Sequence, residues 1–189
     1  AVQLSGDITL PNAINLQGNN HVLLGGINSG GQLENMSGTN TLTGLISTSF
    51  NAAIGAHAGS TRNLNGAWNL GVMTLAFTGN GTINLGTNFS GNIWGIEKYG
   101  QGTVNLTAAN SAVFSNLFTL NGGTFALSGS GTLAGGATLA ATLNAGATLA
   151  VNDTGTAIAN RLGSGRPLSI YNGTFDYTAN GVSNSSQTL

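Results

Sequence analysis

Four copies of one short pattern decide how this chain folds. They read Ser60-Thr61-Arg62-Asn63-Leu64, Gly81-Thr82-Ile83-Asn84-Leu85, Gly102-Thr103-Val104-Asn105-Leu106 and Gly123-Thr124-Phe125-Ala126-Leu127. The copies recur at a constant period of about 21 residues, with Thr in second place and Leu in fifth. Two looser copies follow, Gly146-Ala147-Thr148-Leu149-Ala150-Val151 and Gly173-Thr174-Phe175-Asp176-Tyr177. Self-similarity at a fixed period of this length is typical of a solenoid, in which each repeat packs on its neighbours.

The residues between these copies favour strands over helices. Gly, Asn, Thr and Ser make up 95 of the 189 residues. Gly costs about 1 kcal/mol relative to Ala inside a helix, and the other three compete for helical hydrogen bonds. Alternation such as Ile83 with Leu85 sends every second side chain to one face. We therefore expect one all-β domain over residues 1–189, a right-handed parallel β-helix (solenoid) with about 21 residues per coil.

Stacking of such coils makes definite predictions. Successive coils hydrogen-bond at a spacing of about 4.8 Å, so about nine coils form a rod on the order of 40 Å long. The leucines of the four copies should stack in one inward column, while Asn amides form ladders between coils. The stretch from Thr132 to Val151 has low complexity. It fits a slim, closely packed coil, with a flexible linker as the alternative.

Composition and charge exclude several classes of protein. The formal net charge is −1, so nothing favours binding to nucleic acid or an anionic membrane. Hydrophobic residues make up 40% of the chain, which argues against disorder. No apolar run approaches the roughly 18 residues of a membrane-spanning helix. The absence of Cys excludes disulfides and thiolate metal sites. Only nine residues are charged: Asp7, Glu34, Arg62, Glu97, Lys98, Asp153, Arg161, Arg166 and Asp176.

Three stretches resemble a known repeat family. Residues 98–110, Lys-Tyr-Gly-Gln-Gly-Thr-Val-Asn-Leu-Thr-Ala-Ala-Asn, are followed by Leu-Asn-Gly-Gly-Thr-Phe-Ala-Leu at 120–127. Together they resemble the autotransporter-associated β-strand repeat, K-x-G-x-G-T-L-x-L-x-x-x-N and then V-N-x-G-T-L-x-L. Residues 33–44 and 161–189 are similar to segments of large bacterial proteins that carry these repeats, whereas residues 114–118 depart from the pattern. The resemblance implies a secreted or surface-exposed β-helix without catalytic residues.

The five acids offer little for catalysis on polysaccharides. Glycoside hydrolysis needs two carboxylates about 5 to 9.5 Å apart. Glu34 and Glu97 are separated by three nominal periods, which places them three coils and about 14 Å apart. Asp153 and Asp176 fall one coil apart in different columns. We expect no catalytic residues, although this reading leaves a carboxylate pair open.

Other candidate sites each have a plainer interpretation. His21 and His57 lack a third metal ligand, so we expect surface histidines on turns and no metal or cofactor. Residues 163–166 suit an anion or, better, a turn before Pro167. Scattered aromatic residues suit core or corner positions, with a sugar-stacking face as the alternative. These aromatic residues are Trp68, Trp94, Tyr99, Tyr171 and Tyr177.

The sequence therefore favours a non-enzymatic structural protein. The leading hypothesis is an extracellular or cell-surface rod, stalk or filament, followed by an adhesin or glycan-binding module and then by a polysaccharide-active enzyme. Neither end carries the charged, Pro-rich or helical cap of a solitary solenoid. We expect flanking repeats or further copies of the chain as end-to-end partners, surface glycans as alternative ligands, and either a segment of a longer protein or a filament protomer.

Overall fold

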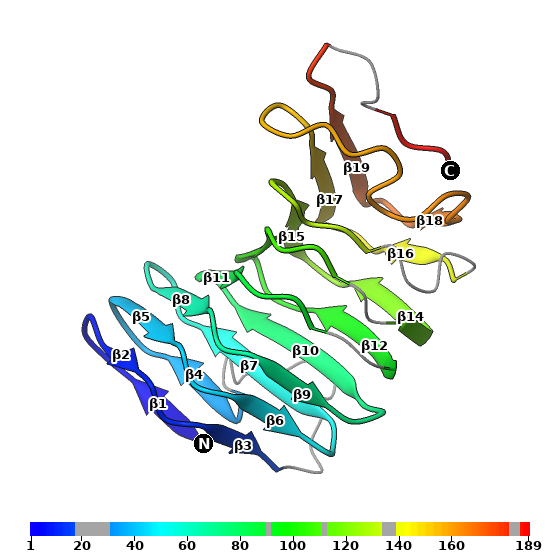
Figure 1. Cartoon of the computed structure of the whole chain (residues 1–189). Helices are drawn as coiled ribbons and strands as arrows, with labels where there is room; N and C mark the ends of the chain where they lie inside the picture. Colours follow the sequence, from blue (N-terminus) through cyan, green and yellow to red (C-terminus); the bar gives the residue numbers. More distant parts are fainter. Residues whose placement is uncertain (18–30, 90–91, 111–112, 134–138, 182–185) are drawn as a thin grey trace.

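The chain is wound into a parallel β-solenoid (Figure 1). The computed structural model describes residues 1–17, 31–89, 92–110, 113–133, 139–181 and 186–189. These residues contain nineteen strands and no helix, so none of them forms a helix that could cross a membrane. The strands pair in parallel, as in β10 against β12 and β11 against β13. The expected all-β solenoid is confirmed.

Three sheets run along the solenoid. Sheet A contains, in spatial order, β1 (Val2–Leu4), β4 (Leu33–Asn35), β7 (Ala52–Ala56), β10 (Thr74–Gly79), β12 (Asn92–Lys98), β14 (Val113–Leu120), β16 (Ala141–Leu143) and β18 (Leu168–Ile170). Sheet B contains β2 (Thr9–Leu10), β5 (Thr39–Leu42), β8 (Thr61–Leu64), β11 (Thr82–Leu85), β13 (Thr103–Leu106), β15 (Gly123–Leu127), β17 (Ala147–Asn152) and β19 (Thr174–Thr178). Sheet C contains β3 (Ile14–Leu16), β6 (Ile46–Thr48) and β9 (Trp68–Leu70).

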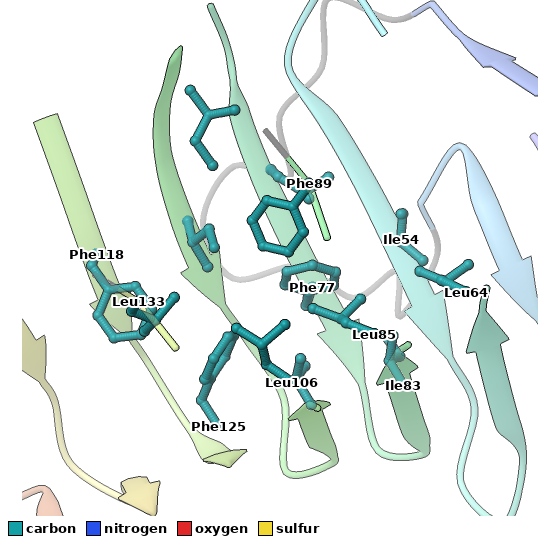
Figure 2. Close-up of a cluster of buried hydrophobic side chains, with 14 of the residues drawn as sticks. Ile54, Leu64, Phe77, Ile83, Leu85, Phe89, Leu106, Phe118, Phe125 and Leu133 are labelled. Carbon is teal, nitrogen blue, oxygen red and sulfur yellow. The ribbon is translucent and has the colours of Figure 1, made fainter. Parts of the chain in front are cut away.

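The register of sheet B confirms the column predicted from the repeat. Leu64, Leu85, Leu106 and Leu127 pair in succession, and each is fully buried. Figure 2 shows the first three projecting into the same interior. The threonines of the four copies also pair in succession, and they point the other way because neighbouring strand residues alternate between faces. The low-complexity stretch supplies β16 and β17, so its described residues form a coil and not a linker.

The Gly that precedes each of these threonines in the later copies is required by close backbone contact. A Cβ atom on Gly102 would lie 2.1 Å from the carbonyl oxygen of Gly81, and one on Gly123 would lie 2.4 Å from that of Gly102. Gly123 also has a φ of +63°, in the region that favours glycine. The Gly-Thr dipeptide therefore marks the corner at which sheet A turns into sheet B.

The coil length varies more than the four central copies suggest. Leu10 pairs with Leu42, so the first coil is longer than the repeat period, and it includes residues 18–30, which lie outside the described part. Val151 pairs with Tyr177, so the last coil also exceeds the period. The coils between these two contain about 22 residues each. Each coil contributes one strand to each long sheet, and both of these sheets have eight strands. This is one fewer than the roughly nine coils expected, because the first and last coils are longer than the repeat period.

Apolar side chains fill the space between sheets A and B. Phe118 and Phe125 meet edge to face with ring centroids 5.3 Å apart, and Trp68 meets Phe89 at 5.9 Å. Phe77 lies beside this group (Figure 2). Burial of each large apolar side chain stabilises the coil by about 1.5 to 3 kcal/mol. The core is continuous along the solenoid, so each inner coil is held by the coils on both sides of it.

Candidate functional site

Glu34 and Glu97 do not share a column in the described structure. Glu34 pairs with Gly55, whereas Glu97 pairs with Ala76, so the two carboxylates lie in different columns as well as three strands apart in sheet A. Their separation by three periods in the sequence suggested that they share one column. However, β10 pairs with β7 at a longer offset than the repeat period, so residues after β7 no longer align with those one period earlier. No group of three or more His, Cys, Asp or Glu that could hold a metal occurs among the described residues.

Asp153 belongs to a buried hydrogen-bonded group with Arg161 and Tyr177, called the clamp below. Its Oδ1 atom accepts a hydrogen bond from Nε of Arg161, and both side chains are fully buried. Its Oδ2 atom accepts from the hydroxyl of Tyr177, with 3.1 Å between the oxygens. Asp176, by contrast, is exposed and pairs with Ala150, so the two aspartates stand in different columns as expected.

The guanidinium of Arg161 extends this clamp to the preceding coil. Nη1 donates to the carbonyl oxygen of Gly131 at 2.7 Å, and Nη2 donates to that of Gly129 at 2.8 Å. A charged donor that satisfies buried carbonyls contributes more than a neutral one. Arg161 therefore fixes the long turn after β17 against the coil beneath it, and Asp153 serves in a structural ion pair.

Arg166 connects coils in the same way, a few residues further along the chain. Its fully buried guanidinium donates to the carbonyl oxygens of Leu162, Leu139 and Leu133, at 2.6, 3.0 and 3.0 Å. Burial lowers the pKa of Arg166. Of the two interpretations of residues 163–166, the turn before Pro167 is the one the geometry supports, because the cation is occupied by backbone carbonyls inside the protein.

Lys98 shows how a lysine of the repeat is used. Its ammonium donates to the carbonyl oxygens of Tyr99, Gly100 and Gly122, at 2.9, 2.8 and 3.3 Å, and the residue is 1% exposed. Burial lowers the pKa of this ammonium to about 8. The hydrogen bonds connect the corner after β12 with the corner of the next coil.

Arg62 is the least satisfied of the buried cations. It occupies an inward position of β8, between Asn40 and Ile83 of the neighbouring strands. Nη2 donates to the carbonyl oxygen of Glu34 at 2.7 Å, but Nε and Nη1 are buried without a protein partner. Burial lowers the pKa of Arg62 to about 10. A charge in this position costs stability and does not face any external ligand.

All four Lys and Arg residues are therefore removed from the surface, each with at most 1% exposure. Asp7 and Asp176 are exposed, and Glu97 is half-buried. The sequence did not predict that the basic residues are buried and two of the acids exposed. A Lys or Arg on the inner face of a strand cannot be told from one on the outer face by residue type alone. The described surface has no basic patch for nucleic acid, anionic lipid or sulfated polymer.

The histidines have no chemical role that the described structure reveals. His21 lies outside the described residues. His57 is half-buried on the turn after β7, where its backbone N–H donates to the carbonyl oxygen of Asn35 at 2.9 Å. This is the turn position that was expected for it.

The five aromatic residues considered for a sugar face do not share one. Trp68 is buried, Tyr99 and Tyr177 are half-buried, and Trp94 and Tyr171 are exposed on different coils. The exposed apolar residues on the coils next to Trp94, Phe50 and Val72, were not among the candidates drawn from the sequence.

On the outer face of sheet B, neutral side chains form a ladder between coils. Nδ2 of Asn84 donates to Oδ1 of Asn63, and Nδ2 of Asn105 donates to Oδ1 of Asn84, each at 2.8 Å. Nδ2 of Asn63 continues the series to the hydroxyl of Thr41 at 3.2 Å. The predicted asparagine ladder is present, and it holds coil to coil.

These contacts define a parallel β-solenoid repeat protein. Comparisons with protein-family models, with curated proteins and with solved structures find no match to this chain.

Proposed function

We propose that this chain is a structural segment of an extracellular or cell-surface rod, stalk or filament. The observation that carries the proposal is the use of the polar side chains. Asn84 and Asn105 bond to the coil before them, and Lys98 and Arg161 bond to carbonyls of adjacent coils. Side chains that an enzyme would direct toward substrate are here directed toward neighbouring repeats.

The resemblance to autotransporter-associated β-strand repeats supports this proposal. In the stretch that carries it, the Lys caps the carbonyls of two successive corners, and each glycine of the Gly-Thr pairs avoids a backbone clash. Both features explain why a K-x-G-x-G-T pattern suits a coil of this kind. A bacterial surface protein of the passenger type, with adhesion as an alternative role, is the source that fits such a repeat.

The two ends of the solenoid support end-to-end stacking. β1 and β18 are the outer strands of sheet A, and β2 and β19 are those of sheet B. Residues 186–188 hydrogen-bond to residues 160–165 of the last coil, but among the described residues no strand pairs with the outer edge of β18 or β19. Unpaired strand edges accept further strands. Val2 and Ile8 at one end are 37% and 40% exposed, and Ile170 at the other is 49% exposed. Further coils, from the same chain or from another copy, would cover these groups.

Sedimentation velocity over a range of concentrations, with electron microscopy of the same samples, tests the proposal. We expect assemblies whose length grows in steps of roughly 40 Å along the coil axis. Ile170→Lys places a charge on an edge strand and should reduce assembly. Leu45→Lys is the control, because Leu45 is 42% exposed but lies between β5 and β6, one coil inside the edge strand β2. A concentration-independent monomer that Ile170→Lys leaves unchanged would contradict end-to-end stacking.

A further inference from the structure

Three exposed apolar side chains lie at the same corner of three successive coils, with Val72 one position away from the sheet A register that Phe50 and Trp94 share. Phe50, Val72 and Trp94 recur at an equal spacing along the chain, and they are 51%, 67% and 46% exposed. Phe50 and Val72 lie two positions before β7 and β10, and Trp94 lies near the start of β12. These strands are neighbours in sheet A (Figure 1). We call these three residues the corner strip, since they follow the corner at which each coil enters sheet A.

The backbone beneath the corner strip is fixed. The N–H of Phe50 donates to the hydroxyl of Thr48 at 3.3 Å, and that hydroxyl donates to the carbonyl oxygen of Phe50 at 2.6 Å. Oδ1 of Asn51 accepts from the N–H of Thr74 at 2.9 Å, and the N–H of Trp94 donates to the carbonyl oxygen of Met73 at 2.8 Å. Covering the strip therefore costs little backbone conformational freedom.

Local irregularities place these side chains outside. Leu70 pairs with Thr48, whereas Leu75 pairs with Ala52, so the corner that contains Val72 holds one residue more than the corner of the coil before it. On the next coil, the register of β12 against β14 shifts between Ile93 and Gly95, directly at Trp94. Bulges of this kind redirect side chains and are frequent at binding sites.

The surroundings of the strip are polar and uncharged. Ser49 and Asn116 are exposed, the latter on the bulged segment of β14. The basic residues of these coils, Arg62 and Lys98, are buried. Glu97, on the same strand as Trp94, is half-buried. An anionic polymer, an acidic peptide or an anionic membrane finds no complementary charge here.

We propose that the corner strip binds a neutral polysaccharide chain that lies along the solenoid axis. Coil spacing separates Phe50 from Trp94 by on the order of 10 Å, which suits alternate pyranose rings of an extended chain stacking their C–H faces on the two aromatic side chains. Ser49 and Asn116 offer hydroxyl and amide partners beside them. A strip of three side chains is too small for a second copy, since a stable protein interface buries about 800 Å² on each partner.

The inference adds a ligand to the proposed rod and does not depend on assembly of the rods. Native affinity electrophoresis in gels containing hydroxyethylcellulose, β-1,3-glucan or mannan, and pull-down on microcrystalline cellulose and chitin, test it. We expect retention on at least one of these polymers. Trp94→Ala should weaken that retention about tenfold or more, whereas Trp94→Phe should retain most of it. Tyr171→Ala is the matched control, because Tyr171 is 64% exposed beyond β18, away from the strip.

Three results would overturn the inference. The first is that the unmodified chain binds none of these polymers. The second is that Tyr171→Ala weakens binding as much as Trp94→Ala, with both variants folded by circular dichroism. The third is that Trp94→Ala alters sedimentation without polymer and leaves polymer retention unchanged, which would make the strip a contact between copies. Failure of end-to-end stacking is read separately, from sedimentation of the unmodified chain without polymer.

Discussion

Replacement of Leu106 by Asp is the sharpest perturbation of the solenoid. Leu106 is fully buried at the middle of its column, between Leu85 and Leu127. Truncating such a leucine to Ala costs about 2 to 5 kcal/mol, because transfer free energy is lost and a cavity remains. Asp adds the cost of placing a carboxylate in an apolar interior, and the group is expected to take up a proton there. The sum approaches the whole stability of an ordinary domain, about 5 to 15 kcal/mol.

Equilibrium urea unfolding, followed by far-ultraviolet circular dichroism, measures this effect. Leu106→Ala should lower the unfolding free energy by about 2 to 5 kcal/mol, and Leu106→Asp should leave no cooperative transition or a far weaker one. Thr103→Asp on the same strand is the control. Thr103 faces outward and is only half-buried, so its replacement should cost about 1 kcal/mol or less. If Leu106→Asp and Thr103→Asp unfold alike, the inward column is wrong.

The buried cations lead to three further predictions. Lys98 has a pKa of about 8 in the fold against 10.5 unfolded, so the unfolded state binds more protons between these values and stability should rise with pH. Above pH 10 two shifts oppose each other: the pKa of Tyr99, raised to about 12 by burial and by Glu97, makes stability fall with pH, whereas the pKa of Arg62, lowered to about 10 by burial, makes it rise. Urea midpoints should therefore rise between about pH 8 and pH 10, and Lys98→Met should remove the rise; a flat profile in the parent would refute it. Arg62→Ile, which matches the apolar residues of later coils, should raise the unfolding free energy by about 1 kcal/mol or more, and a loss would show that the guanidinium is satisfied in solution. Trypsin should leave the native chain intact under conditions that digest the urea-unfolded chain, because its three cleavage residues, Arg62, Lys98 and Arg161, are buried, while Arg166 precedes Pro167; rapid native cleavage would contradict that burial.

The solenoid and its register could be predicted because they depend on local, repeated chemistry. In the later copies of the repeat the Gly marks the corner, because only Gly fits against the carbonyl of the previous coil. The Thr and the Leu that follow it mark the outward and inward faces of the strand. Since stacked coils contact only their neighbours, a constant period in the sequence becomes a column in space. The separation of Asp153 from Asp176 into different columns followed from the same counting.

The sequence by itself therefore determined the coil, the inward leucines, the asparagine ladder and the scarcity of charge. Only the tertiary structure decided which face each irregular residue occupies. The longer coil at Val72 shifts the phase of sheet A, so Glu34 and Glu97 leave their common column and Val72 lies exposed at the same corner as Phe50 and Trp94. The regular spacing of these three apolar residues is visible in the sequence, but their exposure is not. Burial of the cations also depends on the tertiary structure, because each buried cation donates to at least one backbone carbonyl of another coil. Coil stacking brings these carbonyls close, although they are distant along the chain.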